Sequence, residues 1–351
     1  MQNATPTIKI GLWGASSAGK TTFVAALGRA SLRQTFGWSV HTVGPNETDV
    51  VSTQAQINLR KWQGELQRLR FPTSTQTPGE VYTWVLSRPL PPPANPNQGG
   101  LGGLFGGMFG GGVAPAPAAQ PATENVILHV RDVSGEFFSL GTENAAVQDQ
   151  VMRDFAGYDG LIYLYDPAPN PNGEQGTFQN CVQNMGPALI NKYLAACITK
   201  IDDSRVYFDP QTRDVLSQRR IIDSTQWADA TSPPALMETL FHYVAPVHHL
   251  GIRNAFDANR VAYYATTSSG FKSSKMAEHY WDGIDWDDVQ NSRQAEIVES
   301  KNAGNDDLQQ NGSSENTATF KPVMVSPATP INVLEPFLWM YERMRLDGRF
   351  Q

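Results

Sequence analysis

Short apolar runs recur along the chain between polar and glycine-containing stretches, and six of them have the length and the β-branched and aromatic content of buried strands. These runs are residues 7–13, 80–87, 125–132, 160–166, 193–200 and 261–267. Helical periodicity, with apolar side chains at every third or fourth position, follows in residues 20–33, 143–157 and 330–345. This alternation predicts a three-layer α/β fold with a mainly parallel sheet.

The runs 80–87 and 125–132 have no helical pattern between them, which predicts an antiparallel hairpin. We therefore expect a mixed six-stranded sheet with this hairpin at one edge. Between the two runs, residues 89–123 are rich in glycine and proline, a composition that cannot pack a core. They replace a tight turn at the tip of the hairpin.

Two further segments depart from the alternation of strands and helices. Residues 45–70 have a helical pattern that lengthens the connection before the second strand. Residues 271–327 are polar and typical of a surface insertion. Apart from these insertions, residues 1–351 predict a single domain.

The composition narrows the classes of molecule that the protein is expected to bind. The formal net charge of -7 gives no support to nucleic acid as the main partner, since binding of its phosphates needs clustered lysine and arginine. Cys181 and Cys197 are too few for a disulfide framework. The sequence shows no secretory leader pattern and no apolar run of bilayer length, so we expect a cytoplasmic protein without a membrane partner.

The segment GASSAGKT, residues 14–21, follows the first strand run and opens the first helix pattern. It fits the G-x-x-x-x-G-K-[ST] pattern of a phosphate-binding loop, in which Gly14 and Gly19 allow torsions that turn backbone N–H groups toward phosphates. Lys20 can reach the terminal phosphates, and the Thr21 hydroxyl can bind Mg²⁺. The alternative is an ordinary glycine-rich turn. The predicted nucleotide contacts are Gly14, Ala15, Ser16, Ser17, Ala18, Gly19, Lys20, Thr21 and Thr22.

The segment TKID, residues 199–202, ends the fifth strand run. A carboxylate at Asp202 can accept two hydrogen bonds, from the ring N–H and the exocyclic amine of guanine, whereas adenine presents a ring acceptor there. The Lys200 stem can lie over the base plane while its ammonium stays solvated. The alternative is that Asp202 caps the element that follows.

The segment DVSG, residues 132–135, ends the third strand run. Asp132 can hold Mg²⁺ through a water molecule. The backbone N–H of Gly135 can contact a γ-phosphate and move away when that group leaves. The alternative is a plain turn at the end of the strand, closed by the glycine.

In their order along the chain, GASSAGKT, DVSG and TKID resemble the motifs of Ras-like P-loop GTPases, in the class related to translation factors (TRAFAC). The resemblance implies a three-layer G domain that binds GTP or GDP with Mg²⁺. It also implies a switch I threonine that binds Mg²⁺ and γ-phosphate. Thr75 is the first choice for this residue, and Thr73 and Thr77 are alternatives. Contacts to the guanine edge are implied for Ser268 or its neighbour Ser269.

A narrower resemblance connects the chain to the bacterial double-GTPase family, whose members are proposed to act in conflict systems against phage. The similar segments are IGLWGASSAGKTTF, DVSGE, FPTST and INVLEPFLW. This resemblance implies a protein partner, either an effector or a second GTPase component of the system.

Three residues depart from the usual GTPase pattern. Thr199 replaces an asparagine, Ser16 stands where glycine is frequent, and Glu136 stands where many members carry the glutamine that orients the attacking water. A carboxylate beside the γ-phosphate is repelled, so we expect slow hydrolysis. Arg70, near Thr75, is a candidate arginine finger, although a charged helix position is usually a solvated face.

Three functions fit these motifs. The first is a Mg²⁺-dependent GTP-binding switch, in which Lys20, Thr75, Gly135 and Glu136 contribute to hydrolysis. The second is a P-loop ATPase, which leaves TKID without a role. The third is a scaffold that binds nucleotide for stability and does not hydrolyse it. The order of the three motifs favours the GTP-binding switch.

Overall fold

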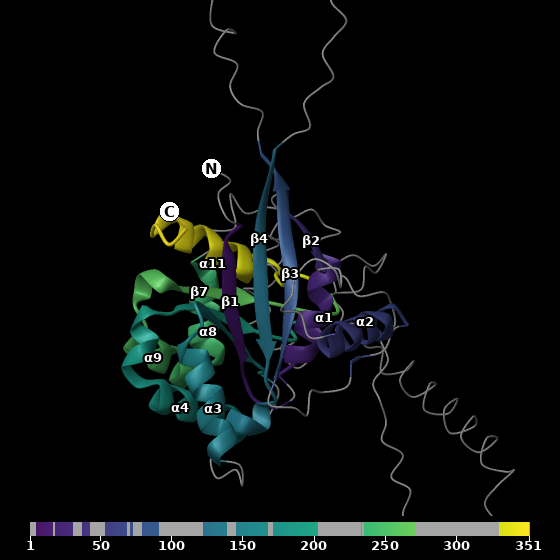
Figure 1. Ribbon diagram of the computed structural model, residues 1–351. Helices are drawn as coiled ribbons and strands as arrows, with labels where there is room; N and C mark the ends of the chain where they lie inside the picture. The colour runs from purple at the N-terminus through teal and green to yellow at the C-terminus, as the bar shows by residue number, and fades with distance from the viewer. Residues whose placement is uncertain are drawn as a thin grey trace, which may run out of the picture.

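The computed structural model describes residues 5–16, 18–30, 37–42, 53–68, 71–72, 79–90, 122–138, 145–167, 171–202, 233, 235–270 and 330–350. These residues form an α/β domain around one seven-stranded sheet with the strand order β2-β3-β4-β1-β5-β6-β7 (Figure 1). The strands are β1 (Thr7–Trp13), β2 (Ser39–Thr42), β3 (Glu80–Pro89), β4 (Thr123–Asp132), β5 (Gly160–Tyr165), β6 (Tyr193–Ile198) and β7 (Val261–Ala265).

The sheet is mixed, as the sequence predicts. β1 pairs in parallel with β4 and β5, and β6 pairs in parallel with β5 and β7. β3 pairs antiparallel with β4 along its whole length, from Glu80 opposite Asp132 to Pro89 opposite Thr123. All six predicted strands are present, and the predicted α/β class is confirmed.

The seventh strand, β2, was not predicted, and it moves the hairpin one strand in from the edge. β2 has four residues, SVHT, of which only Val40 is fully buried. Such a short edge strand exposes most of its side chains, so it lacks the apolar run by which the other strands are found.

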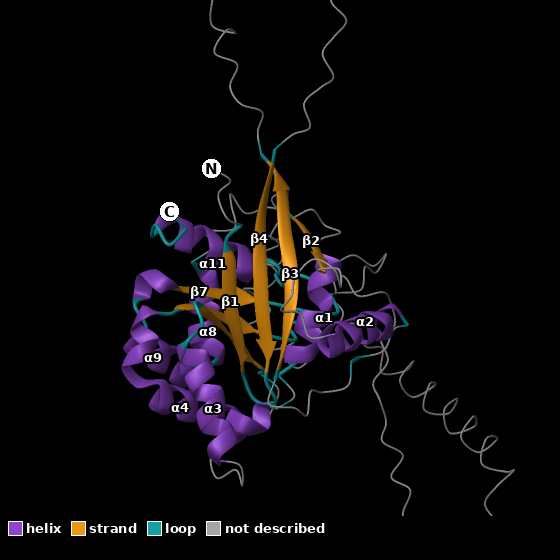
Figure 2. Cartoon of the chain, viewed as in Figure 1, coloured by secondary structure: helices purple, strands orange, loops and turns teal. Residues whose placement is uncertain are grey.

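Helices cover both faces of the sheet and produce three layers (Figure 2). One face carries α1 (Lys20–Ala30), α2 (Thr53–Gln67) and α11 (Glu335–Leu346). The other face carries α3 (Ala145–Ala156), α4 (Pro171–Met185), α8 (Leu236–Val244) and α9 (Pro246–Ala255).

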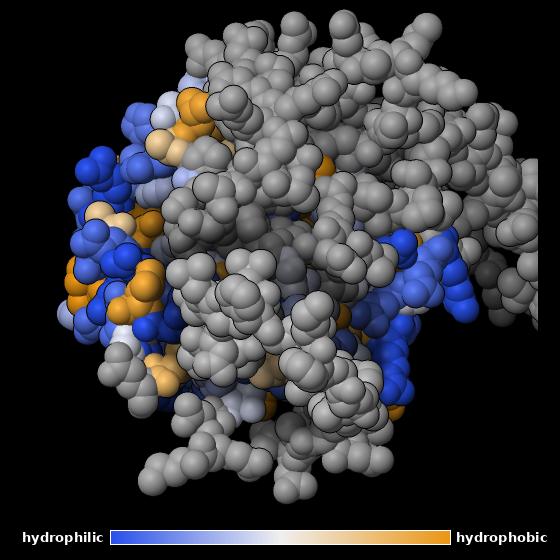
Figure 3. Space-filling view, turned by 90° about the horizontal axis from the view of Figure 1, so that it is seen from above, coloured by the Kyte–Doolittle hydropathy of each residue, from blue (hydrophilic) through white to orange (hydrophobic). Residues whose placement is uncertain are grey.

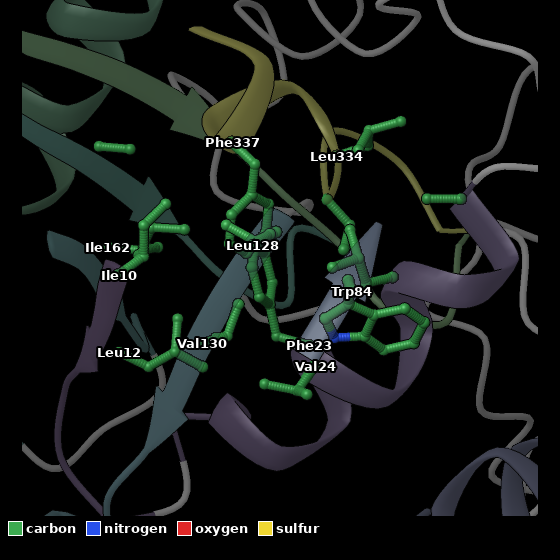
Figure 4. Packing of buried hydrophobic residues seen from close by; sticks show 14 of the residues in the cluster. Ile10, Leu12, Phe23, Val24, Trp84, Leu128, Val130, Ile162, Leu334 and Phe337 are labelled. Atoms are coloured by element: carbon green, nitrogen blue, oxygen red, sulfur yellow. The ribbon is translucent and has the colours of Figure 1, made fainter. Parts of the chain in front are cut away.

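The α1 face shows how the core fixes the helix that follows the predicted phosphate loop (Figure 4). Phe23 of α1 packs against Phe337 of α11, with ring centroids 6.0 Å apart. Leu128 and Val130 of β4 lie in the same buried cluster. Burial of one such side chain contributes about 1.5–3 kcal/mol. The first helix is therefore anchored from both the sheet and the last helix.

The C-terminal helix begins later than the pattern of residues 330–345 predicts, at Glu335. Ile331 instead forms a two-hydrogen-bond bridge with Thr267, with N···O distances of 3.1 and 2.9 Å. The Asn332 side chain donates to the Ala265 carbonyl oxygen at 2.8 Å. Pro336 lies in the first turn of α11, where a proline favours the start of a helix. This segment therefore braces the turn that follows β7.

Most of the predicted insertions lie outside the described residues, including residues 91–121 and 271–329. Within the predicted insertion 45–70, the structure has α2. Within the part of the chain that the structure describes, no helix combines the length and the apolar content needed to cross a bilayer. Hydrophilic and hydrophobic side chains are interspersed among the described residues visible in Figure 3.

Candidate functional site

The candidate site lies at the edge of the sheet where the five parallel strands end. β1, β4, β5, β6 and β7 all point the same way, so the turns after them gather at one edge. These turns carry all three predicted motifs. In open α/β sheets, ligands bind outside the carboxyl ends of the strands.

The predicted phosphate loop connects β1 to α1 through two glycines with positive φ, 151° at Gly14 and 84° at Gly19. A Cβ atom on Gly14 would lie 2.4 Å from the Leu164 carbonyl oxygen, so the loop is pressed against the end of β5. The Lys20 ammonium donates to the carbonyl oxygens of Gly14 and Ala15 at 2.8 and 2.7 Å. The loop thus curves around the ammonium group of Lys20.

The remaining predicted loop residues have different positions. Ala18 is buried and its N–H donates to the Ala15 carbonyl oxygen at 3.3 Å. Ser16 is exposed, and Thr22 is half-buried in α1. Ser17 lies outside the described residues.

Two predicted metal ligands are in contact. The Thr21 hydroxyl donates to a carboxylate oxygen of Asp132 at 2.7 Å, and both residues are buried. Oxygen donors of this kind suit Mg²⁺, which usually takes one or two carboxylates together with substrate phosphates and water. The hydroxyl and the carboxylate therefore fit a magnesium site at the start of α1. Among the described residues, no cluster of three or more His, Cys, Asp or Glu side chains could hold a metal ion.

Gly135 lies directly against the phosphate loop. A Cβ atom at this position would be 1.9 Å from the Ser16 backbone nitrogen and 2.2 Å from the Ala15 carbonyl carbon. No side chain fits such a gap, so the position requires glycine. Gly135 begins a 3₁₀ turn, Gly135–Phe138, and Glu136 belongs to that turn.

Several predicted switch residues lie outside the described part of the chain. These are Arg70, Thr73, Thr75 and Thr77, together with the side chain of Glu136. Their roles stay predictions.

At the other end of the site, Asp202 meets the turn after β7. Asp202 is only 4% exposed, and its carboxylate accepts a hydrogen bond from the Ser269 hydroxyl. The Thr267 hydroxyl in turn accepts from the backbone N–H groups of Ser269 and Gly270, at 3.2 and 2.9 Å. Ser268, the other predicted residue, lies in the same turn and is half-buried. The structure thus brings the two predicted base-end segments together.

The turn after β6 is joined to the turn after β5. The backbone N–H and the hydroxyl of Thr199 both donate to the Tyr165 carbonyl oxygen, at 2.8 and 3.0 Å. The Lys200 ammonium donates to Asp166 at 2.6 Å. Asp166 had no predicted role, although it is the last residue of the strand run 160–166, and ligand-binding residues of this fold class gather at such strand ends.

A second polar cluster connects α2 to the strand beside Asp132. Glu80, directly opposite Asp132 in the sheet, accepts hydrogen bonds from Asn58 of α2 and from the Tyr82 hydroxyl, at 2.9 and 3.1 Å. Burial, together with the negative charges of Asp132 and Glu80, raises the pKa of Tyr82 well above its ordinary value. Tyr82 therefore stays a neutral donor, and α2 is attached next to the candidate metal site.

No protein-family model matches the chain, and no curated protein matches it in sequence. Comparison with solved structures finds a bacterial selenocysteine-specific elongation factor, at 14% identity and a TM-score of 0.27 over 62% of this chain and 23% of that one. Sup35 complexed with GDP is similar at 10% identity and a TM-score of 0.26, over 76% and 38% of the two chains. The GTPase-like domain of S. cerevisiae Ski7 bound to GTP is similar at 11% identity and a TM-score of 0.28, over 87% and 52%.

The chain spans about a quarter to about a half of the length of these three structures, with coverages of 23%, 38% and 52%. At such identities and TM-scores, functional assignment depends on the geometry of the site itself.

Proposed function

We propose that this protein binds GTP and GDP with Mg²⁺ and acts as a molecular switch with slow GTP hydrolysis. One observation carries the proposal: Asp202, held by Ser269, lies at the same edge of the sheet as the loop around Lys20. A phosphate loop alone accepts any nucleoside triphosphate. A buried carboxylate at the base end gives a physical reason for choosing guanine.

Residues at the phosphate end would bind the triphosphate and the metal. Lys20 would exchange the carbonyl oxygens of Gly14 and Ala15 for phosphate oxygens, a charge-assisted contact. Thr21 and Asp132 would hold Mg²⁺, which neutralises charge on the phosphates when bound. Thr75 is the proposed third contributor, from switch I.

Residues at the base end would select the base. The Asp202 carboxylate accepts from both N–H donors on the guanine edge, whereas adenine would leave a buried carboxylate facing an acceptor. The Ser269 hydroxyl orients the carboxylate. Ser268 and Ser269 provide the turn that faces the same edge of the base.

Gly135 would sense whether a γ-phosphate is bound. It approaches the loop so closely that any group bound there changes its surroundings, and its short turn continues into Glu136. A carboxylate at Glu136 cannot act as the neutral water-orienting amide of many GTPases, which supports slow hydrolysis. Arg70 is the proposed source of a compensating positive charge.

Calorimetric titration with GTP, GDP and ATP in the presence of Mg²⁺ tests the proposal. We expect binding of GTP and GDP and little binding of ATP. Asp202→Asn should weaken guanine-nucleotide binding at least about 10-fold, since a buried polar pair is lost. The same substitution should favour xanthosine nucleotides, because the asparagine amide can donate to the carbonyl that replaces the guanine amine.

The matched control is Asp159→Asn, at the opposite end of the strands, where the carboxylate accepts from the Lys9 backbone. It should leave base preference unchanged. Equal affinity for ATP and GTP would contradict the proposal and favour a P-loop ATPase. If GDP and a non-hydrolysable GTP analogue raised the melting temperature of the protein equally, and no partner distinguished the two nucleotide states, a nucleotide-bound scaffold would be favoured.

The proposed biological context is a bacterial conflict system, in which one nucleotide state binds a protein effector or a second GTPase. The short motif resemblance supports this context. The neighbouring genes provide the test: a lone housekeeping locus would contradict it.

A further inference from the structure

Asp166 is a charged residue beside the base end of the site that the proposed nucleotide contacts do not include. It directly follows β5, and its carboxylate accepts a hydrogen bond from the Lys200 ammonium at 2.6 Å. The two residues follow neighbouring parallel strands, β5 and β6. The strand order of the sheet, rather than any local motif, therefore creates this pair.

The backbone around Lys200 is held in an uncommon conformation. Its φ is 54°, in the left-handed region that residues other than glycine seldom adopt. Hydrogen bonds on both sides hold it there: Thr199 donates to the Tyr165 carbonyl oxygen, and the Ile201 N–H donates to the Thr266 carbonyl oxygen at 3.3 Å. Such a conformation persists only where the surroundings fix it. It directs the Lys200 side chain to the end of β5.

The burial of the two side chains is unequal. The Asp166 side chain is 7% exposed, whereas the Lys200 side chain is 37% exposed. A positive charge beside a carboxylate this buried offsets part of the cost of its burial. The ion pair with Asp166 therefore favours one position of the Lys200 ammonium. Part of the Lys200 side chain remains accessible.

We infer that Asp166 is a positioning residue that holds the Lys200 stem as a fixed wall of the base-binding slot. The inference rests on the proposed guanine-nucleotide site. A wall made by a methylene stem contacts the plane of the base, not its edge. Asp166 thus contributes equally to GDP and GTP binding, while the choice between guanine and xanthine remains with Asp202.

A double-mutant cycle on Asp166 and Lys200 tests this role. GDP and a non-hydrolysable GTP analogue are titrated into the full-length wild-type protein, Asp166→Ala, Lys200→Ala and the double variant. We expect each single variant to bind both nucleotides about 10-fold more weakly, the size of effect expected from one positioned contact. The double variant should be no weaker than Lys200→Ala, because Asp166 acts through the lysine.

Two further variants separate positioning from a general structural effect. Asp166→Glu keeps the charge and should recover part of the affinity, whereas Asp166→Asn keeps the shape without the charge and should not. If Asp166→Ala does not fold, Asp166→Asn takes its place in the double-mutant cycle. Asp154→Ala is the matched control: it breaks another partly buried ion pair, with Arg131, and should leave nucleotide affinity unchanged.

The outcomes are distinct. Wild-type affinity in both Asp166→Ala and Asp166→Asn, or losses that add in the double variant, would overturn the positioning role while the GTP-binding proposal stands. A preference for xanthosine nucleotides in Asp166→Asn would also overturn it, since that would place Asp166 at the base edge. Failure of the wild-type protein to bind guanine nucleotides would overturn both the proposed function and this inference.

Discussion

The two ends of the candidate site are built in different ways. At the phosphate end, the loop is one continuous segment, residues 14–21, shaped by the positive φ of Gly14 and Gly19, and Asp132 joins it through the Thr21 hydroxyl. The base end is assembled from three separate turns, which provide Asp166, Lys200 with Asp202, and Ser269. A local segment acts largely through its backbone, whereas an assembled site acts through side chains brought together by the sheet.

This difference separates two properties of the proposed switch. Backbone groups and an ammonium at the phosphate end recognise charge and do not depend on the base. Side-chain groups at the base end recognise hydrogen-bond donors and do not depend on the number of phosphates. Variants at the first end should therefore act on the phosphates whatever the base, and variants at the second end should affect guanine recognition.

The largest expected effect is at Lys20. Lys20→Ala should weaken binding of GTP and GDP about 100-fold, because a charge-assisted hydrogen bond contributes about 1.5–3 kcal/mol. Calorimetric titration checks this loss. The matched control is Lys61→Ala at an exposed position of α2, which should bind like the wild type. A Lys20 variant with wild-type affinity for GTP and GDP would break the comparison between the two ends.

An intermediate effect is expected at Gly135. The Cβ of Gly135→Ala would overlap the Ser16 backbone at 1.9 Å, so this turn must move away from the phosphate loop. We expect the affinity for a GTP analogue to fall about 10-fold while GDP affinity changes little, because only the γ-phosphate needs this contact.

Titration of both nucleotides into Gly135→Ala and Gly64→Ala checks this prediction. A Cβ on Gly64, in α2, would meet nothing within 4 Å, so the control should bind both nucleotides normally. Equal losses for GDP and the GTP analogue would show that Gly135 supports the loop as a whole and does not report the γ-phosphate.

The smallest expected effect is at Ser269. Ser269→Ala removes one hydroxyl donor from the Asp202 carboxylate and should weaken guanine-nucleotide binding about 5-fold, in keeping with about 1 kcal/mol for a typical hydrogen bond. The ratio of GDP affinity to GTP affinity should be the same as in the wild type.

The control for this variant is Ser87→Ala, which removes a hydroxyl that donates to Asn125 at 2.8 Å in the β3–β4 hairpin. It should leave affinity unchanged. A Ser269 variant that alters the ratio of GDP to GTP affinity would show that the base end also senses the phosphates.

The sequence allowed the strands that carry the site to be predicted because each is a long apolar run. It did not allow β2 to be predicted, since four largely exposed residues leave too weak a pattern. The sequence pattern predicted a helix that includes residues 330–334, because their apolar residues fit the helical period. In the structure, Ile331 pairs with Thr267 instead, and this contact outweighs the local pattern.

By itself, the sequence determined the α/β class and the glycine-containing turn between β1 and α1. Both depend on local properties: the period of apolar side chains and the torsions that glycines allow. Only the tertiary structure decided that Asp166 meets Lys200, 34 residues away, and that Ser269 meets Asp202, 67 residues away. These contacts depend on the order of strands in the sheet, which spacing along the chain does not specify.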